Sequence, residues 1–409
     1  MTHPINEERR RALQFGAAAA LAGVLPLSAA AKGVYDVGAN DKEIKLGNLV
    51  PYSGPASAYG VIGLAMTAYF KMVNATGGIN GRQINFISLD DAYSPPRTVE
   101  QTRKLVEQEE VLCMLSPLGT ACNLAVRKYL NSKKVPQLFV NTGATVFGDY
   151  KNFPWTMSWY STYQVEGRVF ARHILDNYPN AKIGVLMQND DFGKDFVKGL
   201  EDGLGDKAKT MIVARQTYDL TDATIDSQLV KLQASGANLF YSVATPKFSA
   251  MAIRKVTELG WKPAYYVASV GASVESVLRP AGLDNAKGIM TTTYLLEPGS
   301  PEAAADKGMQ AYYAWMKQYY PSGNANEVSN VQAYAICATM MQVLKQCGDD
   351  LTRANVMKQA ANLKNFAAPC LWPGIVLNTS PTDYYPMKQK VILRFNGQKY
   401  EAVSKVITA

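Results

Sequence analysis

The sequence predicts an α/β fold built on two mainly parallel sheets with helices on both faces. Three observations carry this prediction. Strand-like and helix-like segments alternate over residues 43–140, the alternation begins again after a break at 152–155, and the last third consists of nearly consecutive helices. Such alternation is typical of parallel sheets covered by helices, and two separate runs of it indicate two sheets.

The first run opens with an apolar strand at 43–50 and a helix at 61–75. Gly77, Gly78 and Gly81 end that helix, because glycine accepts the left-handed backbone found at helix ends. The next helix starts at two prolines, where the missing N–H groups cost little. The remaining elements of this run are a strand at 84–89, that helix at 95–109, a strand at 111–115, a helix at 120–130 and a strand at 137–140.

The second run repeats the pattern, and the end of the chain departs from it. The predicted elements of the second run are a helix at 164–177, a strand at 182–187, a loop at 188–192, helices at 194–204 and 225–234, a strand at 239–243, a helix at 248–259 and a strand at 264–267. Helices at 301–319, 329–345 and 351–362 follow, with a final hairpin at 391–395 and 399–403. Because late helices must cover a sheet already built, we expect the chain to return to its first half after about residue 291.

Residues 1–31 have the composition of a cleaved export signal. Arg9, Arg10 and Arg11 precede an apolar stretch at 12–25 that is too short to span a bilayer, and small residues follow at 28–31. The adjacent arginines favour the twin-arginine route, with the general secretory route as the alternative. The protein is therefore expected in the periplasm.

Charge and motifs favour a binding protein over an enzyme or a nucleic-acid binder. The net charge is +8, but Lys and Arg occur singly or in pairs, whereas nucleic-acid binders cluster them on one face. The sequence contains no nucleophile elbow, no Walker A loop and no dinucleotide-binding glycine motif after a strand. Asp90 and Asp91 end a strand without a partner base, and His173 stands alone on a helix. We expect neither catalysis nor a cofactor.

Five cysteines and two histidines limit the possible metal and redox sites. No two cysteines form a CxxC pair, so a zinc site is not expected. An oxidising compartment permits one or two disulfides, and the sequence leaves the pairing open among Cys113, Cys122, Cys337, Cys347 and Cys370.

Four loops at strand ends are candidates for the binding site. In open α/β sheets, ligands lie at the carboxyl ends of strands, near the free N–H groups of helix N-termini. These loops are residues 52–60, 116–120, 141–145 and 189–193, and the first of them is rich in hydroxyl and aromatic side chains. Ser and Thr there are equally explained as ordinary helix caps, but several such loops converging on one edge indicate a site for a carboxylate.

Several glycine-bearing segments resemble a known family when taken together. They are VPYSG at 50–54, NATGGING at 74–81, the aspartates at 90–91, NTGAT at 141–145, DFG at 191–193 and GL at 282–283. In this order they resemble the type I periplasmic binding proteins, the leucine/isoleucine/valine-binding family of ABC-transporter receptors. The resemblance covers about residues 41–409.

The resemblance implies two Rossmann-like lobes joined by a three-strand hinge that close over a ligand. Lobe I would comprise residues 42–157 and 293–385, and lobe II residues 158–292 and 386–409. The three crossovers would then fall near residues 155–160, 291–294 and 384–388.

The resemblance also implies a set of ligand-binding residues. In amino-acid-binding relatives two first-lobe loops bind the carboxylate and a second-lobe acid binds the ammonium. The acidic position corresponds here to Val270, and a neutral residue cannot offset the desolvation of an ammonium. This disfavours a standard α-amino acid unless Asp190, Asp191 or Glu275 serves instead. Aromatic side chains, Phe248 among them, indicate a stacking pocket. The predicted site consists of Tyr52, Ser53, Tyr59, Leu118, Gly119, Thr120, Gly143, Ala144, Thr145, Tyr163, Asp191, Phe192 and Val270.

These arguments predict the receptor of an ABC importer, a monomer that captures a small carboxylate with an aromatic or apolar body and presents it to a membrane permease. A branched-chain amino acid receptor of the same transporter type is the alternative ligand assignment. A ligand-sensing regulator is the alternative of another class, because the same fold serves sensors. An enzyme such as a hydrolase is disfavoured by the missing catalytic residues.

Overall fold

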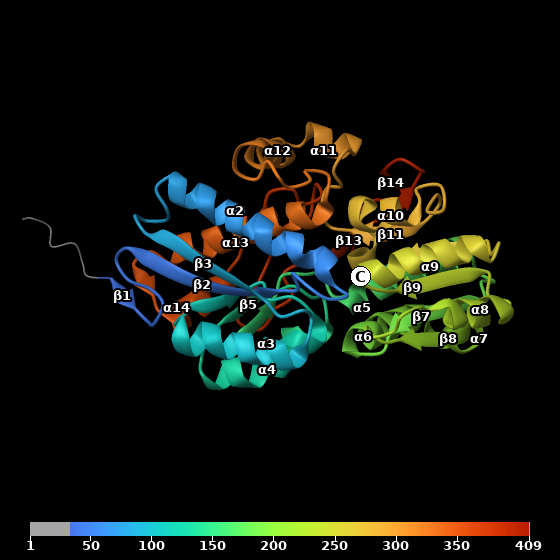
Figure 1. Cartoon of the computed structure of the whole chain (residues 1–409), viewed down its shortest axis with the longest axis horizontal. Coiled ribbons are helices and arrows are strands. Elements are labelled where there is room, and N and C mark those ends of the chain that lie inside the picture. The colour runs from blue at the N-terminus through green and yellow to red at the C-terminus, as the bar shows by residue number, and fades with distance from the viewer. Residues whose placement is uncertain (1–32, 409) are drawn as a thin grey trace, which may run out of the picture. The chain divides into compact units, whose positions relative to one another are not determined.

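A computed structural model describes residues 33–408, and the segment predicted as an export signal lies outside the described residues. Two sheets, both mainly parallel, organise the fold (Figure 1). The predicted α/β class is therefore confirmed. None of the helices between residues 33 and 408 has both the length and the apolar character needed to cross a membrane.

The first sheet has the strand order β3-β2-β4-β5-β6 with all neighbours parallel. Its strands are β2 (Glu43–Val50), β3 (Gln83–Asp90), β4 (Cys113–Leu115), β5 (Gln137–Val140) and β6 (Thr156–Ser158). Its helices are α2 (Val61–Ala75), α3 (Pro95–Arg103) and α4 (Thr120–Ser132). Helix α2 covers one face and α3 and α4 the other (Figure 1). The predicted helix at 95–109 ends in a wider π-type turn, Lys104–Gln108.

The second sheet has the order β14-β13-β11-β10-β9-β7-β8. Its parallel strands are β7 (Ile183–Gln188), β8 (Ile212–Tyr218), β9 (Leu239–Val243), β10 (Ala264–Val267) and β11 (Met290–Thr293). Strands β13 (Gln389–Phe395) and β14 (Tyr400–Ala402) add to it in antiparallel fashion, and β15 (Ile407–Thr408) pairs with β13. The predicted final hairpin is thus confirmed and becomes part of this sheet.

Helices α5 (Tyr163–Asn177) and α6 (Asp191–Leu204) pack against each other beside the second sheet. The short α7 (Ala208–Met211) leads into β8, and α8 (Asp226–Ala234) and α9 (Pro246–Glu258) follow, with α10 (Arg279–Ala281) before β11. The expected loop at 188–192 is shorter than predicted. Asp190 caps α6 by accepting a hydrogen bond from the N–H of Gly193, so the helix already includes Asp191 and Phe192.

The late helices are α11 (Pro301–Ala305), α12 (Lys307–Tyr319), α13 (Val328–Cys347) and α14 (Arg353–Ala360). The prediction of one helix over 301–319 is wrong. Asp306 has an extended backbone and its side chain accepts a hydrogen bond from the N–H of Met309, so it begins a new helix. Helix α13 packs on α2, the helix of the first sheet. Beside them, β1 (Val34–Tyr35) pairs with β12 (Asp350–Leu351).

The chain passes between the sheets after β6, after β11 and before β13, and these three passages are neighbours. Ser161 forms an isolated parallel bridge with Met387. The ring of Tyr294 lies 5.7 Å from that of Trp159 and 5.8 Å from that of Tyr160. Aromatic packing therefore holds the passages against one another.

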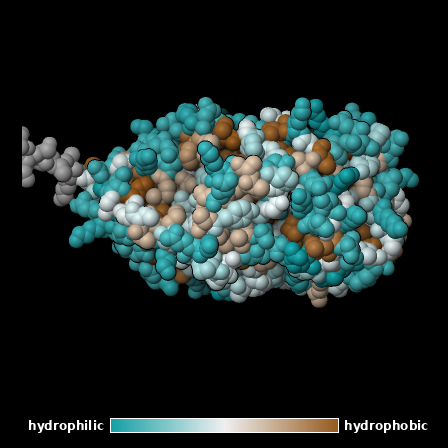
Figure 2. Space-filling model, turned by 90° about the horizontal axis from the view of Figure 1, so that it is seen from above, coloured by the Kyte–Doolittle hydropathy of each residue, from teal (hydrophilic) through white to brown (hydrophobic). Residues whose placement is uncertain are grey.

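The surface and the thiols give further limits. In Figure 2 hydrophilic residues cover most of the visible face, and apolar residues appear in small separate groups. All five cysteines are buried free thiols, so the structure pairs none of them in a disulfide. Burial raises the pKa of the Cys113 thiol to about 12.

Candidate functional site

Loops from the strand ends of both sheets meet around a small cavity of about 20 Å³. Parallel strands end at one edge of their sheet, which is where open α/β sheets bind ligands. Six of the thirteen predicted residues line this cavity: Tyr59, Leu118, Gly119, Tyr163, Phe192 and Val270. The other four are Tyr93, Asn141, Tyr160 and Thr245. Asn141 lies in the candidate loop at 141–145 but was not among the predicted site residues, and the other three were not predicted.

Tyr59 links the two sheets across this cavity. It lies after β2 of the first sheet, and its hydroxyl donates a hydrogen bond of 2.8 Å to the carbonyl oxygen of Val270, which follows β10 of the second sheet. Burial raises the pKa of Tyr59 well above its ordinary value, so the hydroxyl keeps the proton that it donates. Tyr59 therefore lines the cavity and also links the first sheet to the second through a hydrogen bond.

Gly119 brings the N-terminus of α4 to the cavity. Its φ of +99° lies in the region that favours glycine, and a Cβ there would lie 2.7 Å from the ring of Tyr93. The close approach of the Tyr93 ring thus requires glycine. The first N–H groups of a helix have no partner within it and carry a partial positive charge, so this end of the cavity favours an anion.

Aromatic side chains form most of the remaining wall. The ring of Tyr163 stacks on Phe196 at 4.3 Å and meets Phe192 edge-on at 5.3 Å. Tyr160 donates its hydroxyl hydrogen to the side-chain oxygen of Asn141 and accepts a hydrogen bond from Gln332 of α13. The wall is apolar in body, and the hydroxyl of Tyr160 is already bonded to Asn141 and Gln332.

Three predicted residues on the first sheet are engaged elsewhere and do not line this cavity. The Tyr52 hydroxyl lies 2.6 Å from the hydroxyl of Ser88. Ser53 is exposed and donates its hydroxyl hydrogen to Asp90. The hydroxyl of Thr120 lies 2.7 Å from that of Thr142. These side chains hold the strand-end loops in place.

The predicted loop at 143–145 also acts mainly in support. A Cβ on Gly143 would lie 2.7 Å from Tyr163, so this glycine makes room for the aromatic wall. Thr145 donates from its N–H and from its hydroxyl to one oxygen of Asp195, at 2.8 and 2.9 Å, which ties the loop to α6. Ala144 and Asp191 line a separate cavity of about 320 Å³ together with Lys194 and others.

The acids considered as replacements at the position of Val270 are committed elsewhere. Asp190 caps α6 and accepts a hydrogen bond from Gln188, and Glu275 forms an ion pair of 2.7 Å with Arg279. Asp191 is exposed on α6. None of the three lines the cavity at Tyr59.

A second cavity of about 70 Å³ adjoins the first. Tyr59, Tyr160 and Val270 line both cavities, so they form the partition between them. Its other polar walls come from Ser269, Ser273, Ser276, Thr291, Thr292, Thr293, Ser329, Gln332 and Glu297. Sequence reasoning missed this cavity, although the strand-end rule applied to β11 points to the segment that contains Glu297.

A buried ion pair lies beside the second cavity. Lys390 of β13 contacts Glu166 of α5 at 2.6 Å, and both side chains are almost completely buried. The N–H and the hydroxyl of Ser269 each donate a hydrogen bond of 2.7 Å to Glu166. This network holds Ser269, a residue of the cavity wall, against the sheet.

Comparisons with known proteins agree with this architecture. The Leu/Ile/Val-binding protein homolog 1 of Brucella abortus is 23% identical over 329 residues, covering 79% of this chain and 84% of that protein. The crystal structure of a branched-chain amino acid ABC transporter from Thermus thermophilus with bound valine matches with a TM-score of 0.81 at 17% identity, covering 90% of this chain and 97% of that chain. A fatty acid ABC transporter substrate-binding protein from Thermomonospora curvata matches with a TM-score of 0.76 at 19% identity, covering 92% and 95%.

The match to a family model covers most of the chain. The model is described as periplasmic binding protein, and it matches residues 43–383 of the 409. The resemblance inferred from the glycine-bearing segments is confirmed by this match, and the chain belongs to the periplasmic binding protein family.

Proposed function

We propose that the protein is the extracytoplasmic receptor of an ABC importer and captures a small carboxylate between its two sheets. The observation that carries this proposal is the convergence of strand-end loops from both sheets on one aromatic cavity. Gly119 brings the N-terminus of α4 to that cavity, where a negative group is favoured. The permease of the importer would be the macromolecular partner.

The body of the ligand is proposed to be aromatic or apolar. Tyr93, Tyr163 and Phe192 offer ring faces and edges, and Leu118 adds an aliphatic wall. Val270 is neutral, so the loop after β10 supplies no acid for an α-ammonium. The name of the Thermomonospora neighbour, which mentions a fatty acid, supports the same class of apolar acids.

Ligand entry requires the two sheets to separate locally. Cavities of about 20 and 70 Å³ hold only a few water-sized groups, whereas small-molecule sites measure about 300 Å³ or more. The bond between Tyr59 and Val270 would break on opening. We propose that the predicted lobes, residues 42–157 with 293–385 and residues 158–292 with 386–409, move apart about the three neighbouring passages.

A branched-chain amino acid is the second candidate ligand. The names of the Brucella relatives and the valine in the Thermus structure favour it. A ligand-sensing receptor is the alternative of another class. Cell fractionation separates the two classes, because an importer receptor must accumulate outside the cytoplasmic membrane.

A thermal-shift screen tests the ligand class. Benzoate and 3-phenylpropanoate are compared with leucine, isoleucine and valine, and we expect the aromatic acids to raise the melting temperature. Stabilisation by leucine alone would refute the aromatic assignment. Stabilisation by neither class would contradict the proposed carboxylate site.

Two glycine substitutions form a matched pair for this screen. Gly119 and Gly236 both have positive φ, so alanine strains the backbone at either position. Only at Gly119 does the added Cβ meet a cavity residue, because the surroundings of Gly236 are open. We expect Gly119→Ala to abolish the ligand-induced shift, and Gly236→Ala to lower the melting temperature while it preserves that shift.

A further inference from the structure

Glu297 is a buried carboxylate on the wall of the second cavity. It follows β11 at the carboxyl end of the strand, and only 6% of the residue is exposed. Within residues 33–408 its side-chain oxygens take part in no hydrogen bond and no ion pair, although its own carbonyl accepts from Ser300. The carboxylate therefore borders a cavity without a protein partner.

The groups around Glu297 are anionic or neutral. The charge that acts on Glu297 is that of Glu327, another buried carboxylate. Glu327 accepts hydrogen bonds from the hydroxyl of Ser273 and from the N–H of Ser329. Two titratable hydroxyls, those of Tyr313 and Tyr400, also feel the charge of Glu297.

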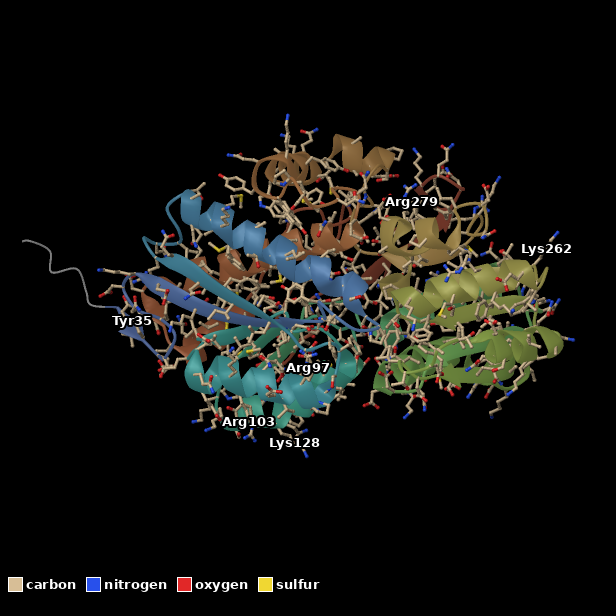
Figure 3. All side chains as sticks on the ribbon, in the orientation of Figure 1. Tyr35, Arg97, Arg103, Lys128, Lys262 and Arg279 are labelled. Atoms are coloured by element: carbon tan, nitrogen blue, oxygen red, sulfur yellow. The ribbon has the colours of Figure 1, made fainter. Side chains whose placement is uncertain are left out.

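Cations of the protein are engaged elsewhere. Lys390 lies near the ring of Tyr294, but its ammonium pairs with Glu166. The labelled Arg103, Lys128 and Lys262 lie at the outer edge of the fold (Figure 3). Arg97 and Arg279 form ion pairs with Asp90 and Glu275. No lysine or arginine of the described chain neutralises Glu297.

A charge in this situation needs a partner. Burying an ionised carboxylate without a counter-charge is expensive, so the group either holds a proton or meets a cation from outside. Burial and the charge of Glu327 raise the pKa of Glu297 to about 8. The free protein thus holds a proton on Glu297 at neutral pH.

The cavity has the room and the additional acceptors that a protonated nitrogen needs. A volume of about 70 Å³ accommodates an ammonium group. The hydroxyl of Thr292, on the same wall, is buried and has no partner within the described residues, whereas Thr291 and Thr293 donate to backbone carbonyls. An ammonium offers three donors, which a carboxylate and a hydroxyl can accept.

We propose that Glu297 is the ligand's cation-binding residue, and that the ligand carries a protonated nitrogen which enters the second cavity past Tyr59 and Val270. The proposal rests on the proposed function and narrows its ligand to acids that also bear an amine. The acidic residue that binds the ammonium would then lie on the segment after β11, and not on the loop after β10, where Val270 is neutral. Binding releases the proton of Glu297 to the solvent, since the ammonium stabilises the ionised carboxylate.

Calorimetry on the full chain tests this with matched probes. Leucine and phenylalanine are compared with their analogues that lack the amine, 4-methylpentanoate and 3-phenylpropanoate, at pH 6.5 in two buffers of different ionisation enthalpy. At least one amino acid is expected to bind more tightly than its deaminated analogue and to release about one proton. The deaminated analogue is expected to release none.

Glu297→Gln and the control Glu258→Gln complete the experiment. Glu258 is exposed on α9. Glu297→Gln is expected to weaken amino acid binding on the order of 30-fold or more and to remove the proton release, and Glu258→Gln to change neither. The proposal is overturned if the amino acids do not bind, or if they bind both variants equally. In that case, if a deaminated acid binds, the proposed function is still supported and only the role of Glu297 is refuted. If none of the four acids binds, both the proposed function and the role of Glu297 are refuted.

Discussion

Two buried carboxylates near the meeting point of the sheets have opposite surroundings. Glu166 on α5 is 1% exposed and has an ammonium and two donors from Ser269 within 2.7 Å. Glu297 after β11 is nearly as buried and has no bonded partner in residues 33–408. Both residues are glutamates, so the difference arises entirely from what the fold places beside them.

The comparison separates a structural charge from one available to a ligand. Glu166 finds its counter-charge and hydrogen-bond donors inside the protein, and these contacts link α5 to β13 and to the loop after β10. The side chain of Glu297 has no counter-charge and no hydrogen-bond donor within residues 33–408, and it borders a cavity. A buried group that the fold leaves unsatisfied is the one to examine for ligand binding.

The largest effect is expected from removing the partner of Glu166. Lys390→Met preserves the length of the side chain but leaves a buried carboxylate without its cation. We expect the free energy of unfolding, measured by urea denaturation, to fall by about 3–5 kcal/mol. The double variant Glu166→Gln/Lys390→Met should recover much of this loss, and a single variant as stable as the wild type would contradict the structural role of the pair.

A pH-dependent effect of similar size is expected at Glu297. Its pKa is raised from 4.5 to about 8 on folding, so the folded state holds the proton more tightly. The free energy of unfolding therefore falls as the pH rises from about 4.5 to about 8. Above pH 8, Glu297 causes no further decrease. Glu297→Gln should remove this pH dependence. At pH 9 its free energy of unfolding should be higher than that of the wild type by a few kcal/mol, because each pH unit of the shift contributes about 1.4 kcal/mol.

Comparison of urea denaturation curves at pH 5, 7 and 9 measures this effect. Other buried acids, such as Asp190 and Asp195, also titrate with raised pKa values, but they do so in both proteins. The difference between variant and wild type thus isolates Glu297. A difference that does not change with pH would show that Glu297 is ionised throughout and has an internal partner.

The smallest effect is expected at the partition between the cavities. Tyr59→Phe removes the hydrogen bond to the carbonyl of Val270 and keeps the ring. We expect a loss of about 0.5–1.5 kcal/mol in unfolding free energy. Tyr218→Phe, which alters a buried hydroxyl network within the second half alone, is the control for loss of a hydroxyl. Small-angle scattering should show a more open ligand-free protein only for Tyr59→Phe.

Most elements of the fold follow from local patterns, and the exceptions have physical causes. The predicted bounds of Glu43–Val50, Gln137–Val140 and Leu239–Val243 agree with the structure, because these strands are mostly buried and mainly apolar. Strand β8 escaped prediction because it lies at the sheet edge, where exposed and half-buried residues alternate and three polar residues follow one another at 215–217. The break at Asp306 depends on a cap, which an apolar periodicity does not reveal.

The site was predictable as loops at strand ends but not as individual contacts. Gly119 and Phe192 lie at the cavity as expected, whereas Thr145 bonds to Asp195 on another element. Such pairings depend on how the two sheets meet, which no local pattern encodes. Glu297 follows a short strand of threonines, and nothing in its neighbourhood in the sequence announces that it is buried.

Strand β13 reaches the second sheet only at the end of the chain, and it lies between β11 and β14. Lys390 on this strand is 224 residues away from Glu166 in sequence. A chain that stops before residue 389 therefore lacks both an inner strand and the cation of a buried acid. Synthesis of residues 389–402 is thus a checkpoint for this half of the molecule, because the buried Glu166 gains its counter-charge only when Lys390 is present.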